Sequence, residues 1–210
     1  MTRTNGNIKA IIFDLGNVLV DFDHRVAANR IAQYCNKSAR DIYDLFFDSE
    51  TTRLFEEGKI SEEDFFLKVK SALDLDLDFS GFVPIWNEIF FLSIKNRAVY
   101  ALAEKLKKRY RTAVLSNINS LHYEYIKKTF PVFGAFHEVF TSCQLGFIKP
   151  DHRIYAGALS ALGVRACEAF YTDDRLELIE SAAKLGIRCA TFSGFVQLET
   201  DLAGAGININ

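Results

Sequence analysis

The chain has 210 residues and a formal net charge of −2, and hydrophobic residues make up 49% of it. This length and composition allow one large domain, or a core domain with a small one, and they exclude wholesale disorder. The basic residues are scattered, so no positive field is available to hold nucleic acid, and no apolar run approaches the ~18 residues of a membrane span. The four cysteines are dispersed and no signal peptide is evident, so we expect reduced thiols in a cytoplasmic protein of unspecified oligomeric state.

A buried strand is predicted over residues 10–13, where the apolar run Ala-Ile-Ile-Phe leads directly into Asp14. Continuous apolar runs of this kind are typical of strands covered on both faces of a parallel sheet. Ligands of open parallel sheets bind beyond the carboxyl ends of the strands, so Asp14 is expected at a ligand site. We expect Gly16 to let the backbone turn sharply beside it.

Residues 23–92 have a helical pattern, including an apolar helix expected over residues 79–92. A crossover between parallel strands needs only one helix, so this much helix predicts a separate cap bundle. The cap is assigned to residues 21–93 and the core domain to residues 1–20 and 94–210. The aromatic residues expected to form the bundle core are Phe46, Phe47, Phe55, Phe65, Phe66, Phe82, Trp86, Phe90 and Phe91.

Strands and helices alternate regularly along the rest of the chain. Helices are expected over residues 96–109, 120–129, 154–162 and 176–185, and strands over residues 112–115, 138–142, 169–172 and 187–192. Regular β-α alternation predicts an α/β fold with a Rossmann-like parallel sheet flanked by helices.

Polar residues with matching chemistry follow four of these strands or their loops. They are Asp14, Ser116 with Asn117, Lys149, and Asp173 with Asp174. Three carboxylates at one point repel each other unless a cation neutralises them, and Mg²⁺ is a hard ion that takes oxygen ligands and shares substrate phosphate. A hydroxyl, an amide and a lysine suit phosphate oxygens, and a carboxylate can carry a phosphoryl group covalently. The set therefore predicts phosphoryl chemistry with Asp14 as the nucleophile.

Four short motifs, in order and suitably spaced, resemble those of the haloacid dehalogenase-like hydrolase superfamily over essentially the whole chain. They are residues 13–18, 115–117, 149–155 and 173–175. The resemblance implies a Rossmann-like core with a helical cap, Mg²⁺ as cofactor, and most often phosphatase activity on a small phosphorylated metabolite. Residues 55–61 resemble the cap of sugar-phosphate phosphatases, which makes a sugar phosphate one expected substrate.

Carried over position by position, the resemblance implies a role for each of these residues. Asp14 would be the nucleophile and also a magnesium ligand. The other magnesium ligands would be the Gly16 carbonyl, Asp174 and Asp173, the last directly or through water. The phosphate would be bound by Ser116, Asn117 and Gly16 and neutralised by Lys149.

Two positions depart from the family pattern. Most phosphatases of the superfamily have an acid/base aspartate where this chain has Gly16, and such assistance is worth about 10²–10⁴ in rate. Candidate replacements are Asp21, Asp23, His24 or a residue of the cap. Leu178 stands where Asn or Asp often follows the fourth motif, which loosens control of the metal.

Two other functions fit part of this pattern. A 2-haloacid dehalogenase would also use Asp14 as nucleophile, and a leaving halide needs no proton, but such enzymes need no metal and usually lack the Asp173–Asp174 pair. A catalytically quiet member that binds a phosphorylated ligand is supported by Gly16 alone. The acidic pair favours the phosphatase.

Overall fold

The computed structural model describes residues 7–209, with all of their side chains except those of Phe47 and Asp48. Its strands are β1 (Ala10–Phe13), β2 (Asp21–Phe22), β3 (Phe90–Phe91), β4 (Arg111–Ser116), β5 (Glu138–Thr141), β6 (Ala169–Asp173) and β7 (Arg188–Thr191). Its helices are α1 (His24–Ile31), α2 (Ala39–Asp48), α3 (Glu50–Glu56), α4 (Glu62–Leu73), α5 (Phe79–Asn87), α6 (Ile94–Lys107), α7 (Ser120–Thr129), α8 (Ser142–Leu145), α9 (His152–Leu162), α10 (Leu176–Lys184) and α11 (Phe195–Gly204). Between residues 7 and 209, no helix combines the length and apolar character that crossing a membrane requires.

A parallel sheet with the strand order β5-β4-β1-β6-β7 forms the centre of the fold, which confirms the predicted Rossmann-like α/β architecture. Ile12 of β1 is paired with Ala113 of β4 on one side and with Tyr171 of β6 on the other. The chain leaves β1 toward β4 and β5, then crosses back to β6 and β7. Such a reversal beside the first strand creates the crevice in which doubly wound folds bind their ligands.

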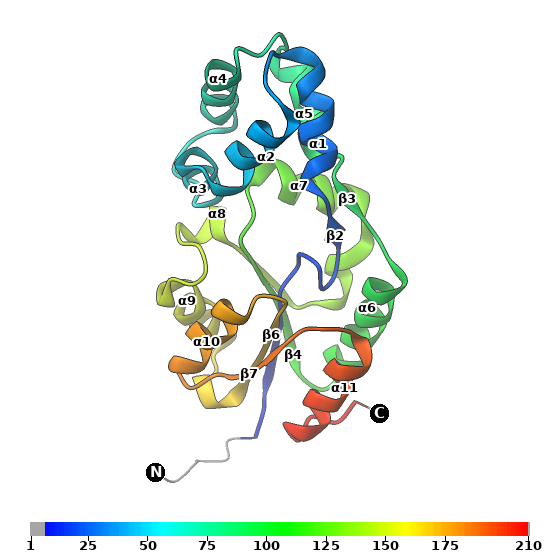
Figure 1. The fold of residues 1–210 in the computed structure, drawn as a ribbon. Coiled ribbons are helices and arrows are strands. Elements are labelled where there is room, and N and C mark those ends of the chain that lie inside the picture. The colour runs from blue at the N-terminus through cyan, green and yellow to red at the C-terminus, as the bar shows by residue number, and fades with distance from the viewer. Residues whose placement is uncertain (1–6, 210) are drawn as a thin grey trace.

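Helices cover both faces of this sheet (Figure 1), which explains why the central strand β1 is apolar along its whole length. Ile11 and Phe13 point into a cluster with α6, α7 and α11. Ala10 and Ile12 point the other way, into a cluster with α9 and α10. Each strand therefore contributes alternate side chains to two separate cores.

Helices α1 to α5 gather at the opposite end of the molecule from the chain termini (Figure 1) and share a core of their own. That core contains the buried aromatic residues Phe46, Phe55, Phe65, Phe66, Phe82 and Trp86, as expected. The side chain of Phe47 lies outside the described residues, and Phe91 is 51% exposed, so its assignment to the core was wrong. The division into a cap of residues 21–93 and a core domain stays a prediction.

The helix expected over residues 79–92 is shorter than predicted. Helix α5 ends at Asn87, and Phe90–Phe91 instead forms the antiparallel strand β3 with Asp21–Phe22 of β2. These two segments are the passages of the chain between the sheet and the helical bundle. Pairing them satisfies the backbone groups of both passages, and no local pattern in either segment signals a partner so distant in sequence.

Candidate active site

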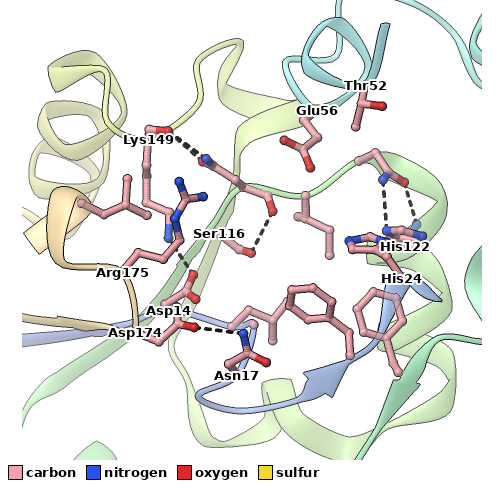
Figure 2. A pocket seen from close by; sticks show the side chains of 18 of the residues that line it. Asp14, Asn17, His24, Thr52, Glu56, Ser116, His122, Lys149, Asp174 and Arg175 are labelled. Atoms are coloured by element: carbon pink, nitrogen blue, oxygen red, sulfur yellow. Dashed lines mark hydrogen bonds and ion pairs between the residues drawn. The ribbon is translucent and has the colours of Figure 1, made fainter. Parts of the chain in front are cut away.

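The predicted site residues come together because three adjacent strands end side by side. Asp14 directly follows β1, Ser116 ends β4 and Asp173 ends β6, and these strands are neighbours in the sheet. A cavity of about 410 Å³ lies between this edge and the helical bundle, as Figure 2 shows. The predicted residues that line it are Asp14, Gly16, Ser116, Asn117, Lys149 and Asp174. Asp173 lies behind them, fully buried.

Lys149 is the buried cation around which the acidic groups are arranged. Its Nζ lies 2.6 Å from Asp14 Oδ1 and 2.7 Å from Asp173 Oδ2, and it also donates to the Leu115 carbonyl at 3.0 Å. Burial by itself would lower the pKa of Lys149, but the two carboxylates raise it above its ordinary value. The ammonium is therefore a fixed positive charge beside Asp14.

Asp14 has an unusual electrostatic environment for a carboxylate. Burial, opposed by Lys149 and reinforced by the negative charges of Asp173 and Asp174, raises its pKa to about 7. Its backbone N–H donates to the Thr172 carbonyl at 2.9 Å, which fixes the residue to β6. Lys149 bonds Oδ1, and Oδ2 accepts no hydrogen bond from the described residues.

Asn117 holds the lysine in place through both ends of its side-chain amide. Its Nδ2 donates to the Lys149 carbonyl at 2.9 Å, and its Oδ1 accepts from the Lys149 backbone N–H at 2.7 Å. The sequence predicted that Asn117 binds phosphate. Since its side chain is engaged here, any contact with phosphate would come from its backbone N–H.

The acidic cluster fits a magnesium ion by the chemistry of its donors. Asp14, Asp173 and Asp174 each offer a carboxylate oxygen, and these oxygens lie within 4.8 Å of one another. Hard oxygen ligands are what Mg²⁺ prefers, and a divalent cation among three carboxylates removes their mutual repulsion.

The two aspartates after β6 differ in how far they are already engaged. Asp173 Oδ2 accepts from Lys149 and from the Tyr171 hydroxyl, and its Oδ1 accepts from the Arg175 backbone N–H at 3.0 Å. Asp174 is bonded through Oδ2 to Asn17 Nδ2 at 2.9 Å. Asp174 therefore has more capacity left for a metal, whereas Asp173 mainly positions Lys149.

Gly16 is required for a different reason from the one expected. The residue with a left-handed backbone in this turn is Asn17, at φ 55°, so the expectation that Gly16 makes the sharp turn was wrong. A Cβ on Gly16 would lie 2.8 Å from Cε1 of Phe22. The Phe22 ring thus occupies the space into which a longer side chain at position 16 would extend.

The far wall of the cavity is aromatic and carries two histidines, His24 and His122 (Figure 2). His122 stacks on Trp86 with ring centroids 4.7 Å apart. Burial lowers the pKa of His122 to about 3 and that of His24 to about 4, so both rings are uncharged at neutral pH. Neither ring therefore adds positive charge to the cavity wall at neutral pH.

The residue that sequence reasoning missed is Glu56, the last residue of α3, whose carboxylate reaches the cavity from the helical bundle. The only signal in the sequence was the resemblance of segment 55–61 to the family's cap, and Glu56 lies two residues before Gly58 in that segment. Of the other replacements considered for Gly16, His24 lines the cavity, whereas Asp21 and Asp23 do not.

The chain is similar in sequence to known hydrolases. The sequence model of the haloacid dehalogenase-like hydrolases matches residues 8–186. The chain is 25% identical to a D-ribitol-5-phosphate phosphatase of Bacteroides thetaiotaomicron, with 85% of this chain and 89% of that protein covered. It is also 25% identical to a sesquiterpene phosphatase of Aspergillus oryzae, with 85% of this chain and 87% of that protein covered.

A solved structure shares the fold. It is a haloacid dehalogenase family enzyme from Bacteroides thetaiotaomicron, in complex with magnesium and inorganic phosphate. The two structures superpose with a TM-score of 0.77 at 23% sequence identity, covering 88% of this chain and 94% of that one.

Proposed function

Since the chain belongs to the haloacid dehalogenase-like hydrolases, we propose that it is a magnesium-dependent phosphatase that hydrolyses a small phosphorylated metabolite through an aspartyl-phosphate on Asp14. The observation that carries the proposal is the cluster of Asp14, Asp173 and Asp174, whose oxygens lie within 4.8 Å of one another beside a buried lysine. A dianionic phosphate needs concentrated positive charge, which a metal and a lysine together supply. Halide displacement needs no such metal site.

Each residue of the site has a separate role in phosphoryl transfer. Oδ2 of Asp14 attacks phosphorus while Lys149 holds Oδ1. The Ser116 hydroxyl, whose contact with the Asn117 carbonyl is long at 3.4 Å, is available to a phosphate oxygen, and the backbone N–H of Asn117 would bind a second one. Water then attacks the phosphorus of the aspartyl-phosphate, which releases phosphate and restores the carboxylate.

Magnesium would be held by Asp14, the Gly16 carbonyl and Asp174, with Asp173 contributing behind them. When bound, it supplies positive charge that neutralises phosphate oxygens and favours the ionised form of the carboxylates. Selectivity would come from residues 21–93, which we propose form a cap over the cavity. The two relatives act on a polyol phosphate and on a sesquiterpene phosphate by their names, so a sugar phosphate stays one substrate among those to test.

The decisive experiment measures phosphate release from a panel of phosphate esters, with Mg²⁺ or with EDTA. Wild-type protein should release phosphate only with the metal. Asp14→Asn should lose roughly 10⁴-fold or more of kcat because the nucleophile is gone. Asp44→Asn is the matched control, since it changes an exposed aspartate of α2 that does not line the cavity.

Absence of release by the wild type under every metal would refute the proposal. Chloride release from 2-chloropropionate would then identify a dehalogenase. Binding of phosphate esters without any turnover would identify the quiet member instead.

A further inference from the structure

A phosphatase of this kind needs a proton donor, and Gly16 supplies none. The oxygen of the leaving alcohol must gain a proton as its bond to phosphorus breaks, and the attacking water must later lose one. His122 cannot provide it, because its Nδ1 accepts from Asn119 and its Nε2 bonds the Trp86 carbonyl. His24 is half-buried against the same aromatic wall, and its pKa is lowered to about 4, so its ring is uncharged at neutral pH.

The two aspartates near Gly16 in sequence are engaged elsewhere. Asp21 is paired with Lys95 at 2.8 Å, outside the cavity. Asp23 caps α1 and is held by the Arg25 guanidinium. Neither carboxylate lines the cavity.

Glu56 is the one carboxylate that the helical bundle contributes to the cavity wall among residues 7–209. Figure 2 shows its side chain extending from α3 into the cavity, on the opposite side from Asp14 and Asp174. Within the described part of the chain, its carboxylate forms no hydrogen bond or ion pair. Glu56 is half-buried at the cavity wall, so its carboxyl group can meet a bound ligand there without first breaking a contact within the protein.

The backbone of Glu56 is fixed to the sheet domain, although α3 belongs to the helical bundle. The Ser142 hydroxyl donates to the Glu56 backbone carbonyl at 2.6 Å, and Ser142 Oγ in turn accepts from the Ile118 backbone N–H at 2.9 Å. Two residues on, Gly58 lies so close to α8 that a Cβ would stand 2.2 Å from the Cys143 carbonyl oxygen. The backbone from which the Glu56 side chain enters the cavity is therefore fixed to the sheet domain, and Asp14 lines the same cavity.

The charges around Glu56 suit a group that must both give and accept a proton. Burial raises its pKa to about 7; Arg175 and Lys149 oppose that rise and Glu57 adds to it. Cys143 on α8 is the other titratable group that faces it. Both protonation states are thus accessible near neutral pH, which is the condition for efficient general acid and base catalysis.

We propose that Glu56 is the general acid and base of this active site, in place of the carboxylate that Gly16 lacks. In the first step Asp14 Oδ2 bonds to phosphorus, the bond to the ester oxygen breaks, and the Glu56 carboxyl gives its proton to that oxygen. In the second step the Glu56 carboxylate takes a proton from water, the water oxygen bonds to phosphorus, and the bond to Asp14 breaks. Glu56 ends protonated as it began. This role rests on the proposed phosphatase function.

The test compares two substrates of similar shape, phenyl phosphate and 4-nitrophenyl phosphate. Nitrophenolate leaves readily without a proton, whereas phenol needs one. For Glu56→Gln, kcat/KM on phenyl phosphate should fall about 10²–10⁴-fold, with a much smaller fall on 4-nitrophenyl phosphate. Since the second step lacks its base, the variant should also release a burst of nitrophenol stoichiometric with enzyme.

Two controls separate this role from a structural one. Glu50→Gln, at the exposed start of the same helix, should keep wild-type kinetics on both esters. Glu56→Ala should recover activity on phenyl phosphate when formate is added, because a small carboxylic acid can fill the vacated space. Thermal unfolding checks that the variants remain folded.

An equal loss on both esters, or no loss, together with no formate rescue, would overturn the role of Glu56 and leave the phosphatase function standing. A wild type that releases phosphate from neither these esters nor the wider panel would overturn the proposed function and this role with it.

Discussion

His122 makes a specific prediction about stability in acid. The side-chain oxygen Oδ1 of Asn119 accepts from the His122 backbone N–H at 3.0 Å, so the side-chain nitrogen Nδ2 of Asn119 must face His122 Nδ1. An amide nitrogen can only donate, which makes Nδ1 an acceptor and places the ring proton on Nε2, toward the Trp86 carbonyl. A second proton on Nδ1 would face a donor in a ring that is 4% exposed, so the folded protein resists protonation here.

The size of the effect follows from linkage. Burial lowers the pKa of His122 in the folded state from 6.5 to about 3, so below pH 6.5 the unfolded chain binds a proton that the folded protein refuses. Its contribution to stability is complete above that pH and is lost as the pH falls toward 3. Between pH 7 and pH 5, preferential proton binding by the unfolded chain changes the base-10 logarithm of the folding equilibrium constant by roughly 1.4. At 1.36 kcal/mol for each tenfold change, the loss of stability is about 2 kcal/mol. Any folded-state pKa below about 4 leads to nearly the same loss.

Urea unfolding at these two pH values, for wild type and His122→Gln, measures this difference. Glutamine keeps a donor for the Trp86 carbonyl but binds no proton, so the variant should be less stable at pH 7 yet lose about 2 kcal/mol less than wild type on acidification. His152→Gln changes an exposed ring and should follow the wild type. If His122→Gln loses as much stability as wild type between pH 7 and pH 5, the ring is not held neutral and the reasoning fails.

Three further predictions concern the acidic site and its neighbour. Lys149→Met leaves the buried carboxylates of Asp14 and Asp173 without their cation, so it should lower the free energy of unfolding by about 3–5 kcal/mol. In denaturant unfolding, an unchanged midpoint would contradict the ion-pair geometry. Gly16→Ala should cost about 1–3 kcal/mol because its Cβ meets the Phe22 ring at 2.8 Å, and adding Phe22→Leu should recover most of that loss; equal stabilities of the single and double variants would argue against the clash. Mg²⁺ at ~100-fold excess over its Kd should stabilise the wild type by about 2.7 kcal/mol, seen as a higher Tm, and Asp14→Asn should lose most of that rise; the same rise in both proteins would place the ion elsewhere.

The geometry around Gly16 connects the sequence departure to the rest of the site. Phe22 fills the space beside Gly16, and Phe22 belongs to β2, the strand that pairs with β3 at the passage into the helical bundle. A carboxylate at position 16 could not extend there without displacing this ring. In our proposal the proton donor comes instead from the opposite wall of the cavity, where Glu56 lies.

The sequence by itself determined the parts of this protein that depend on local pattern. Apolar runs such as residues 10–13 predicted the strands of the sheet, and the alternation of strands and helices after residue 96 predicted the parallel fold. The carboxylates at the strand ends could also be anticipated, because adjacent parallel strands end at one edge of the sheet. The sequence did not predict helices α8 and α11. Helix α8 has only four residues, too few for a periodic pattern, and α11 follows the last strand, where no further strand marks its end.

Only the tertiary structure decided how these residues meet. The β2–β3 pairing and the position of Lys149 between Asp14 and Asp173 are contacts between segments far apart in sequence. The approach of Glu56 to the cavity depends on how the helical bundle is fixed to the sheet through Ser142. Such contacts are set by packing of the whole chain against itself, and a local pattern carries no information about which distant segment will supply the partner.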